Sequence, residues 1–257
     1  MSSIHPTAIV ADGAQIGSDV TIGPYCTVGD EVKIGNGSRL ISHVVVDGAT
    51  TIGERCTVFP FACVGTQTQD LKYEGAATFV EIGDQTTLRE YVTVNSGTSA
   101  GEVTRVGRGC HIMAYCHIAH ACNVGNEVIM ANCATLAGEV VVEDQVILGG
   151  MAGVHQFVRI GRLCIVGGCT KVTKDCMPFM TVDGNPARNR GVNRVGLERR
   201  GVESDAQRHL KQAYRILCRE DLATRRALDR IADEVPECVE VSHLVSFVRN
   251  SERGVIR

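Results

Sequence analysis

Every sixth residue of this chain is aliphatic over most of its length. From Ile4 to Val172, Ile, Leu, Val or Met fills 26 of the 29 positions at this interval. An amphipathic helix would repeat its apolar residues at intervals of three and four, and a half-buried strand at intervals of two. A period of six is typical of a parallel β-helix, in which six residues form one short strand with its corner and 18 residues complete one triangular coil.

Smaller residues form a second series two positions before the aliphatic one. Six cysteines fall on this series, which indicates packing in a reducing compartment: Cys26, Cys56, Cys110, Cys116, Cys122 and Cys164. The twelve cysteines of the chain include no CxxC pair, so we expect no structural zinc site. Glycine often follows the aliphatic residue, where we expect sharp turns or positive φ, as at Gly17, Gly23, Gly29, Gly35, Gly53, Gly65, Gly83, Gly107, Gly125, Gly161 and Gly167.

Two polar segments interrupt the period without changing its phase. The first excursion, residues 67–78, contains the exceptions Asp70 and Ala76, and the second excursion, residues 97–104, contains Ala100. A loop that leaves a solenoid without disturbing the stacking is usually a functional insertion. The alternative is a tolerated surface loop with no function.

The period of six ends after Lys174, and residues 177–191 are rich in Pro, Gly and Asn. The pattern then predicts helices, the first capped by Ser204 with an apolar stripe, the others over about residues 222–235 and 239–249. These helices are too short to bury their own apolar faces, so we expect them to pack on the coil or on a neighbouring subunit. We therefore predict a β-helix over residues 1–176, and a linker with a C-terminal helical domain over residues 177–257.

The charge of the chain is divided unevenly between these regions. The net charge of -3 argues against nucleic acid as a general partner. Residues 1–184 carry a net charge of -7 and residues 185–257 a net charge of +4. The basic end could receive an acidic partner, or its charges could simply be solvated. The sequence shows no secretory leader and no apolar run long enough for a transmembrane segment, so we expect a cytoplasmic protein.

Four histidines form the most promising chemical cluster: His111, His117, His120 and His155. Gly138 lies one coil of 18 residues after His120, so their backbones should be about one strand spacing, ~4.8 Å, apart. A histidine can act as a general base toward a hydroxyl while a nearby backbone N–H stabilises the oxyanion on a thioester carbonyl. This arrangement would suit acyl transfer, although a histidine on a polar strand is more often an ordinary surface residue.

Several longer motifs make the interpretation more specific. The sequence contains QDLKY at 69–73, HIAH at 117–120, LAG at 136–138, GGMAGVHQF at 149–157 and GVNRVGLERRG at 191–201. Together these motifs resemble the UDP-N-acetylglucosamine O-acyltransferases that open lipid A synthesis. The resemblance covers nearly the whole chain, including the helical tail.

The resemblance implies a left-handed parallel β-helix that forms a homotrimer with active sites between subunits. The expected reaction moves a 3-hydroxyacyl group from acyl carrier protein, which is acidic, to the 3-hydroxyl of UDP-N-acetylglucosamine, with no metal or other cofactor. His120 matches the general base and Gly138 the oxyanion donor. The remaining matches are to substrate-binding positions: Gln69, Asp70, Lys72, His117, His155, Gln156, Gly168, Asn193, Arg199 and Arg200. Glycine at 168, where side-chain size limits the acyl groove, favours a longer acyl chain.

The chain departs from the family pattern beside the base. Ala121 stands where most relatives have an acid, Glu139 and Asn95 where they often have histidine, and Val195 where an acid is commonest. Glu139 lies one coil and one residue beyond His120, so we hypothesise that its carboxylate replaces the missing partner of the imidazole. The alternative is that Glu139 and Asn95 change the acceptor pocket, for example toward an amino-substituted sugar.

Two other function classes remain open from the sequence. Some hexapeptide trimers are carbonic anhydrases in which three histidines hold zinc, and His111, His117 and His120 are available here. The placement of these histidines on adjacent faces does not obviously converge. A non-catalytic trimer that binds carrier protein or sugar nucleotide is the second alternative, because Ala121 replaces the usual acid.

Overall fold

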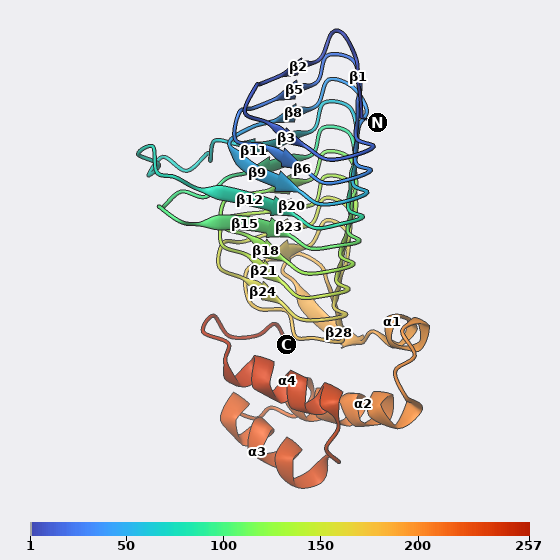
Figure 1. Cartoon of the computed structure of the whole chain (residues 1–257). Coiled ribbons are helices and arrows are strands. Elements are labelled where there is room, and N and C mark those ends of the chain that lie inside the picture. Colours follow the sequence, from blue (N-terminus) through green and yellow to red (C-terminus); the bar gives the residue numbers. More distant parts are fainter. Residues whose placement is uncertain (1) are drawn as a thin grey trace.

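The computed structural model describes residues 2–257 as a left-handed parallel β-helix with a helical region at its C-terminal end (Figure 1). The N-terminus lies near one end of the coil, and the helices cover the other end. The sequence therefore predicts the fold class correctly.

Three parallel sheets form the sides of the coil. In order along each sheet, the strands of sheet A are β1 (Ser3–Ile4), β4 (Thr21–Ile22), β7 (Arg39–Leu40), β10 (Thr57–Val58), β13 (Thr87–Leu88), β16 (His111–Ile112), β19 (Ile129–Met130), β22 (Ile147–Leu148), β25 (Ile165–Val166), β27 (Met180–Asp183) and β28 (Arg188–Val192). Those of sheet B are β2 (Ile9–Val10), β5 (Thr27–Val28), β8 (Val45–Val46), β11 (Cys63–Thr66), β14 (Thr93–Asn95), β17 (His117–Ile118), β20 (Thr135–Leu136), β23 (Gly153–Val154) and β26 (Lys171–Val172). Those of sheet C are β3 (Gln15–Ile16), β6 (Lys33–Ile34), β9 (Ala49–Ile52), β12 (Phe79–Ile82), β15 (Val103–Val106), β18 (Asn123–Val124), β21 (Val141–Val142) and β24 (Arg159–Ile160).

Inward-pointing aliphatic side chains build one continuous core. Regular pairing such as Ile118 with Leu136 stacks each aliphatic residue on its equivalent in the next coil. From Ile22 onward, the residues of the aliphatic series are buried except at the three exceptions Asp70, Ala76 and Ala100. The six cysteines expected to pack are also buried. The period of six is therefore the spacing at which side chains point toward the axis of the coil.

Each coil has three corners, which we number by the sheets that they connect. Corner 1 leads from sheet A to sheet B (113–116 in the central coil), corner 2 from sheet B to sheet C (119–122), and corner 3 from sheet C to sheet A (125–128). Both excursions leave the coil at corner 2, between β11 and β12 and between β14 and β15. Figure 1 shows them projecting on the same side of the molecule.

The glycines after the aliphatic residues lie at turns, as expected, but few of them have positive φ. Of those eleven glycines only Gly65 has positive φ, and the left-handed backbone instead falls two residues later, as at Tyr25 (φ 58°) and Ala121 (φ 53°). A Cβ added to Gly23 would lie 1.7 Å from the carbonyl oxygen of Ile41 in the next coil. The expected sharp turns are confirmed, since all of these glycines but Gly65 directly precede a turn, whereas positive φ was wrong for all but Gly65. Close stacking of the coils explains why glycine is used there.

An exposed ladder of rings runs along corner 1. Its members are stacked with neighbouring centroids 4.8–5.0 Å apart, in the order Tyr25, His43, Phe61, Tyr91 and Tyr115. Each ring belongs to the residue that has left-handed backbone at corner 1 of its own coil. The regular rise of the coil therefore brings these side chains into contact outside the core.

The C-terminal region begins with elements that the periodicity does not predict. Strand β27 pairs parallel with β25 and antiparallel with β28, and the helices are α1 (Arg194–Arg199), α2 (Ser204–Cys218), α3 (Thr224–Glu234) and α4 (Val239–Arg249). Ser204 is the first residue of α2 and not its cap, because Glu203 is the N-cap residue and makes no side-chain capping bond. The expectation of a Ser204 cap was therefore wrong.

The helices pack on the end of the coil, as expected. One buried cluster combines Leu163, Met177 and Phe179 with Leu210 and Leu244 of the helices. Because the two regions share this cluster, the division of the chain at 176 and 177 stays a prediction. None of the helices in residues 2–257 is both long enough and apolar enough to span a membrane.

Candidate active site

Corner 2 brings His120 and Gly138 together. Strand β17 pairs with β20 in a register that stacks the corner of His120 on that of Gly138, and the Glu139 N–H donates to the His120 carbonyl oxygen at 3.0 Å. A Cβ added to Gly138 would lie 2.2 Å from His120 Nε2. The Gly138 N–H has no hydrogen-bond acceptor among the described residues. The imidazole therefore lies directly against a residue without a side chain and with a free amide.

His117 lies on the strand that precedes this corner. Its Nδ1 is 2.7 Å from the hydroxyl of Thr93 in the neighbouring coil. Burial lowers the pKa of His117, and the nearby charge of His120 lowers this pKa further. His117 therefore stays neutral when His120 takes up a proton.

The first excursion brings a carboxylate to His120. Asp70 Oδ2 is 3.7 Å from His120 Nε2. The Lys72 backbone N–H donates to Asp70 Oδ1 at 3.0 Å, while the side chains of Gln69 and Lys72 are exposed. Asp70 and Lys72, two residues apart on this loop, do not form an ion pair with each other among residues 2–257.

Glu139 sits at the left-handed position of the next coil, with φ 59°. Its side chain lines a cavity of about 490 Å³ together with Phe157, Arg159 and Arg253. Among the described residues, the ion-pair partner of the His120 imidazole is Asp70, and Glu139 makes neither a hydrogen bond nor an ion pair with it. The proposed partnership of Glu139 with His120 stays a prediction.

His155 and Gln156 lie one coil beyond Gly138 at the same corner and are exposed. His155 Nδ1 is 3.2 Å from the Gln156 carbonyl oxygen and 3.4 Å from Arg253 Nη2. The Gln156 carbonyl can only accept and arginine can only donate, so the two contacts need different tautomers of His155 and do not form as hydrogen bonds together. Arg253 belongs to the C-terminal segment, so residues nearly one hundred positions apart meet at this corner.

The other predicted site residues lie at different corners of the same chain. Gly168 is at corner 1, where an added Cβ would lie 3.3 Å from the Gly150 carbonyl oxygen. Asn193 is buried at corner 3, donates to the Leu163 carbonyl oxygen at 2.8 Å and caps α1 by accepting from Gly196 N–H. Arg200 pairs with Glu127 at corner 3, and Arg199 is exposed beside it. One chain therefore does not bring the whole predicted set together.

The structure offers little support for thiol chemistry or a metal site. Burial raises the pKa of Cys116 to about 11, so this thiol is held away from its reactive thiolate form. His111 lies on sheet A and His117 on sheet B. Within residues 2–257, no three His, Cys, Asp or Glu side chains are grouped so that they could hold a metal ion.

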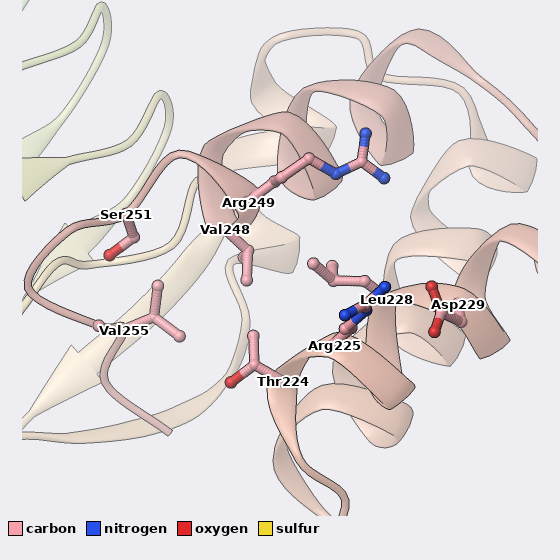
Figure 2. A pocket seen from close by; sticks show the side chains of 9 residues that line it. Thr224, Arg225, Leu228, Asp229, Val248, Arg249, Ser251 and Val255 are labelled. Carbon is pink, nitrogen blue, oxygen red and sulfur yellow. The ribbon is translucent and has the colours of Figure 1, made fainter.

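A separate cavity of about 480 Å³ lies in the helical region. Figure 2 shows Leu228 and Val248 facing each other between α3 and α4, with Val255 of the C-terminal segment nearby. Arg225 and Arg249 also line it, but none of the predicted site residues does. These two arginines place positive charge around the cavity, at the basic end of the chain.

Sequence reasoning missed three residues near the histidines: Thr98, Glu102 and Arg253. Thr98 and Glu102 belong to the second excursion, which had been recognised as a functional insertion without a role for any side chain. The clustering of both excursions at one corner was the available signal. No sequence pattern pointed to Arg253, because its position depends on how the helical region folds back on the coil.

Known proteins resemble this chain along its whole length. A family model described as UDP-N-acetylglucosamine O-acyltransferase, domain 2, matches residues 175–256, and a model of six bacterial transferase hexapeptide repeats matches residues 104–138. The acyl-acyl-carrier-protein–UDP-N-acetylglucosamine O-acyltransferase of Thermodesulfovibrio yellowstonii is 48% identical over 258 residues and covers 100% of both chains. Its counterpart from Synechocystis is 43% identical and covers 97% of this chain and 90% of its own.

Solved structures agree with the sequence comparison. The UDP-N-acetylglucosamine acyltransferase of Bacteroides fragilis superposes with a TM-score of 0.96 at 35% identity, covering 99% of this chain and 100% of its own. The Arabidopsis enzyme of the same name superposes with a TM-score of 0.88 at 34% identity, with the same coverage. From these full-length matches, the chain belongs to the family of UDP-N-acetylglucosamine O-acyltransferases.

Proposed function

We propose that this enzyme transfers a 3-hydroxyacyl group from acyl carrier protein to the 3-hydroxyl of UDP-N-acetylglucosamine, the reaction that opens lipid A synthesis. The observation that carries the proposal is the position of His120 Nε2 against Gly138, whose amide has no acceptor within residues 2–257. A base and an oxyanion donor side by side are the two groups that acyl transfer from a thioester requires.

In the proposed mechanism, His120 Nε2 takes the proton of the sugar hydroxyl as its oxygen attacks the thioester carbonyl carbon. The C–O bond forms, and the negative charge that develops on the carbonyl oxygen accepts a hydrogen bond from the Gly138 N–H. When the tetrahedral intermediate collapses, the C–S bond breaks and the carrier-protein sulfur takes the proton from the imidazolium. His120 is then neutral again.

The roles of the remaining residues are part of the proposal. Asp70 and Lys72 would meet the sugar and the acyl group beside the base, with Gln69, His117, His155 and Gln156 lining the same cleft. Asn193, Arg199 and Arg200 would receive the nucleotide, for which arginine is well suited because its fork matches phosphate geometry. Gly168 would leave room for a long acyl chain.

The distribution of these residues supports a homotrimer with shared active sites. They lie at corners 1, 2 and 3 of one chain. Residues at different corners can therefore face one substrate only if corners of neighbouring subunits meet. The acidic carrier protein would approach the basic C-terminal end, which carries Arg225 and Arg249 around its cavity. A cytoplasmic location and the absence of a nucleic-acid partner remain predictions.

In this proposal Glu139 keeps the role predicted from its sequence position, as a carboxylate partner of the base. Glu139→Gln should then lower kcat with little change in the affinity for the sugar nucleotide. An unchanged kcat would assign Glu139 to the acceptor pocket instead.

Asn95 supports a second candidate, N-acylation of a 3-amino UDP-sugar. Its Nδ2 donates to Thr66 Oγ1 at 3.1 Å, while its buried Oδ1 has no partner among the described residues. A 3-hydroxyl has one hydrogen, which His120 takes, whereas a 3-amino group has a second N–H that can donate to this free acceptor. The two candidates share the base, the oxyanion donor and the acyl donor.

A mass-resolved transfer assay tests the proposal. It would use 3-hydroxyacyl carrier proteins of several chain lengths with UDP-N-acetylglucosamine or its 3-amino analogue, and would compare the wild type with His120→Ala. We expect ester product from the wild type and a loss of about 10²-fold to 10⁴-fold in the variant. Amide product alone would favour the second candidate, and binding without product from any donor would favour a non-catalytic trimer.

A further inference from the structure

The second excursion is organised around a single carboxylate. Glu102 Oε2 accepts a hydrogen bond from the Thr98 N–H at 2.8 Å. The Glu102 carbonyl oxygen also accepts from Phe79 N–H at 2.9 Å, where the first excursion rejoins the coil. Gly97 packs so closely that an added Cβ would lie 2.5 Å from Glu102 Cβ. Glu102 therefore fixes the shape of its own excursion and joins it to the first.

Thr98 transmits this order to the first excursion. Its hydroxyl donates to Asp70 Oδ2 at 3.5 Å and lies 3.3 Å from the Thr68 hydroxyl oxygen. Thr68 Oγ1 in turn accepts from the Asp70 N–H at 3.1 Å. Thr98 and Thr68 are both buried. Asp70 is thus held from two sides, by a threonine of each excursion.

The end of this chain of contacts is His120. Asp70 Oδ2 lies 3.7 Å from His120 Nε2, whereas the buried Nδ1 has no hydrogen-bond partner among the described residues. Burial raises the pKa of Glu102, but hydrogen bonds from Thr98 and Ser99 and the charge of His120 outweigh burial and hold this pKa below its ordinary value. Glu102 is therefore ionised at neutral pH and lies within electrostatic reach of the imidazole.

We propose that Glu102 is a positioning residue for the general base. It holds Thr98, and through Thr98 the Asp70 carboxylate, against His120, and its own charge stabilises the imidazolium that forms during transfer. An acid on a neighbouring loop thereby does what a carboxylate directly after the histidine would do, since Ala121 occupies that position. This role rests on the proposed function, because it concerns the protonated state of His120 in that reaction.

Kinetic analysis of Glu102→Ala and Glu102→Gln tests the role. Removing both the bond and the charge in Glu102→Ala should lower kcat on the order of 10-fold to 100-fold, with KM for the sugar nucleotide within about twofold. Glu102→Gln keeps an oxygen for the Thr98 amide and loses only the charge. It should lower kcat by about 3-fold to 10-fold, and the fall of kcat on the acid side should move to lower pH because the imidazolium is less stabilised.

A charge-matched control and a double variant separate positioning from general effects. Glu74→Gln removes a charge from an exposed site on the first excursion and should leave kcat and its pH profile unchanged. Thr98→Val removes the hydroxyl bond to Asp70 but keeps the charge of Glu102, so it should lower kcat by less than Glu102→Ala does. Combining Thr98→Val with Glu102→Ala should cost little more than Glu102→Ala alone. Thr98→Val also keeps the test usable if Glu102→Ala does not fold.

The outcomes distinguish this role from the proposed function itself. An active wild type with kcat and pH profile unchanged in Glu102→Gln and Thr98→Val would overturn the role of Glu102 and leave the function standing. A rise in KM alone would also overturn it, because that would place Glu102 in substrate binding. No product from the wild type would overturn both.

Discussion

The regular coils and the two excursions use the chain in opposite ways. In the coils each residue has an equivalent 18 positions away, and apolar side chains such as Ile118 and Leu136 are buried by that repetition. In the excursions no position repeats, and the threonines and carboxylates are held by hydrogen bonds within and between the two loops. Stability therefore belongs to the part that repeats, whereas the environment of His120 belongs to the part that does not.

Gly138→Ala should separate catalysis from stability most strongly. The new Cβ would occupy the space of His120 Nε2, 2.2 Å away, so the imidazole must move. We expect kcat to fall on the order of 10²-fold to 10⁴-fold, with little change in thermal unfolding. Gly153→Ala is the matched control in the next coil, since its Cβ would meet nothing within 4 Å. Equal losses in both variants would contradict the interpretation.

Ile22→Ala should have the opposite effect, a loss of stability with unchanged catalysis. Ile22 is 1% exposed in a coil far from the histidines, and its truncation leaves a cavity in the core. The free energy of unfolding should fall by about 2–5 kcal/mol, measured by urea unfolding at fixed protein concentration, while kcat at low temperature stays the same. Thr21→Ala, at the exposed neighbouring position, should change stability by less than about 0.5 kcal/mol. A large fall in kcat for Ile22→Ala would show that coil and site are coupled.

Glu143→Gln tests the junction between coil and helices. Burial raises the pKa of Glu143, but hydrogen bonds from His243 and the Arg162 N–H and the nearby cations hold it below its ordinary value of 4.5. A lowered carboxyl pKa stabilises the fold above that value, and the contribution is lost as pH falls through the lower folded-state pKa. We expect the variant to be less stable by about 1.5–3 kcal/mol at pH 7 and equal to the wild type in strong acid.

The control for this junction is Glu81→Gln. Glu81 forms an exposed ion pair with Arg105 on sheet C, so its loss should cost no more than about 1 kcal/mol. Thermal unfolding between pH 3 and pH 8 would compare the two variants. A pH-independent difference for Glu143→Gln would mean that its packing, and not its charge, matters.

Leu71→Ala should have the smallest effect on stability. Leu71 is fully exposed on the first excursion, between Asp70 and Lys72. Its truncation should change the free energy of unfolding by less than about 0.5 kcal/mol. A loss above about 2 kcal/mol would show that the tip of the excursion is buried against another chain, and the contrast between coils and excursions would then need revision.

The sequence predicts the repeating part of this molecule far better than the rest. Because the coil has a fixed length of 18 residues, simple counting brings His120 to Gly138. Counting fails at the excursions, where Thr98 and Glu102 reach Asp70 through contacts that no period encodes. It also led us to place positive φ at the glycines, because spacing alone does not show which residue of a turn has left-handed backbone.

The C-terminal region shows a second limit. Helix α4 begins and ends where the sequence predicts, since its apolar periodicity is clear. The hairpin of β27 and β28 and the short helix α1 were missed, because Pro, Gly and Asn in this stretch indicate turns whether or not strands lie between them. The position of Arg253 beside His155 depends on that folding and could not be predicted.

The ladder at corner 1 gives this enzyme a built-in optical reporter. The chain has no tryptophan, so its intrinsic ultraviolet fluorescence comes from five tyrosines. Three of them, Tyr25, Tyr91 and Tyr115, stand exposed in the ladder, and the rings of Tyr91 and Tyr115 are stacked at 4.8 Å. Any event that covers corner 1 will therefore change the tyrosine emission of the unlabelled protein. Subunit assembly can then be followed at the protein concentrations at which catalysis is measured.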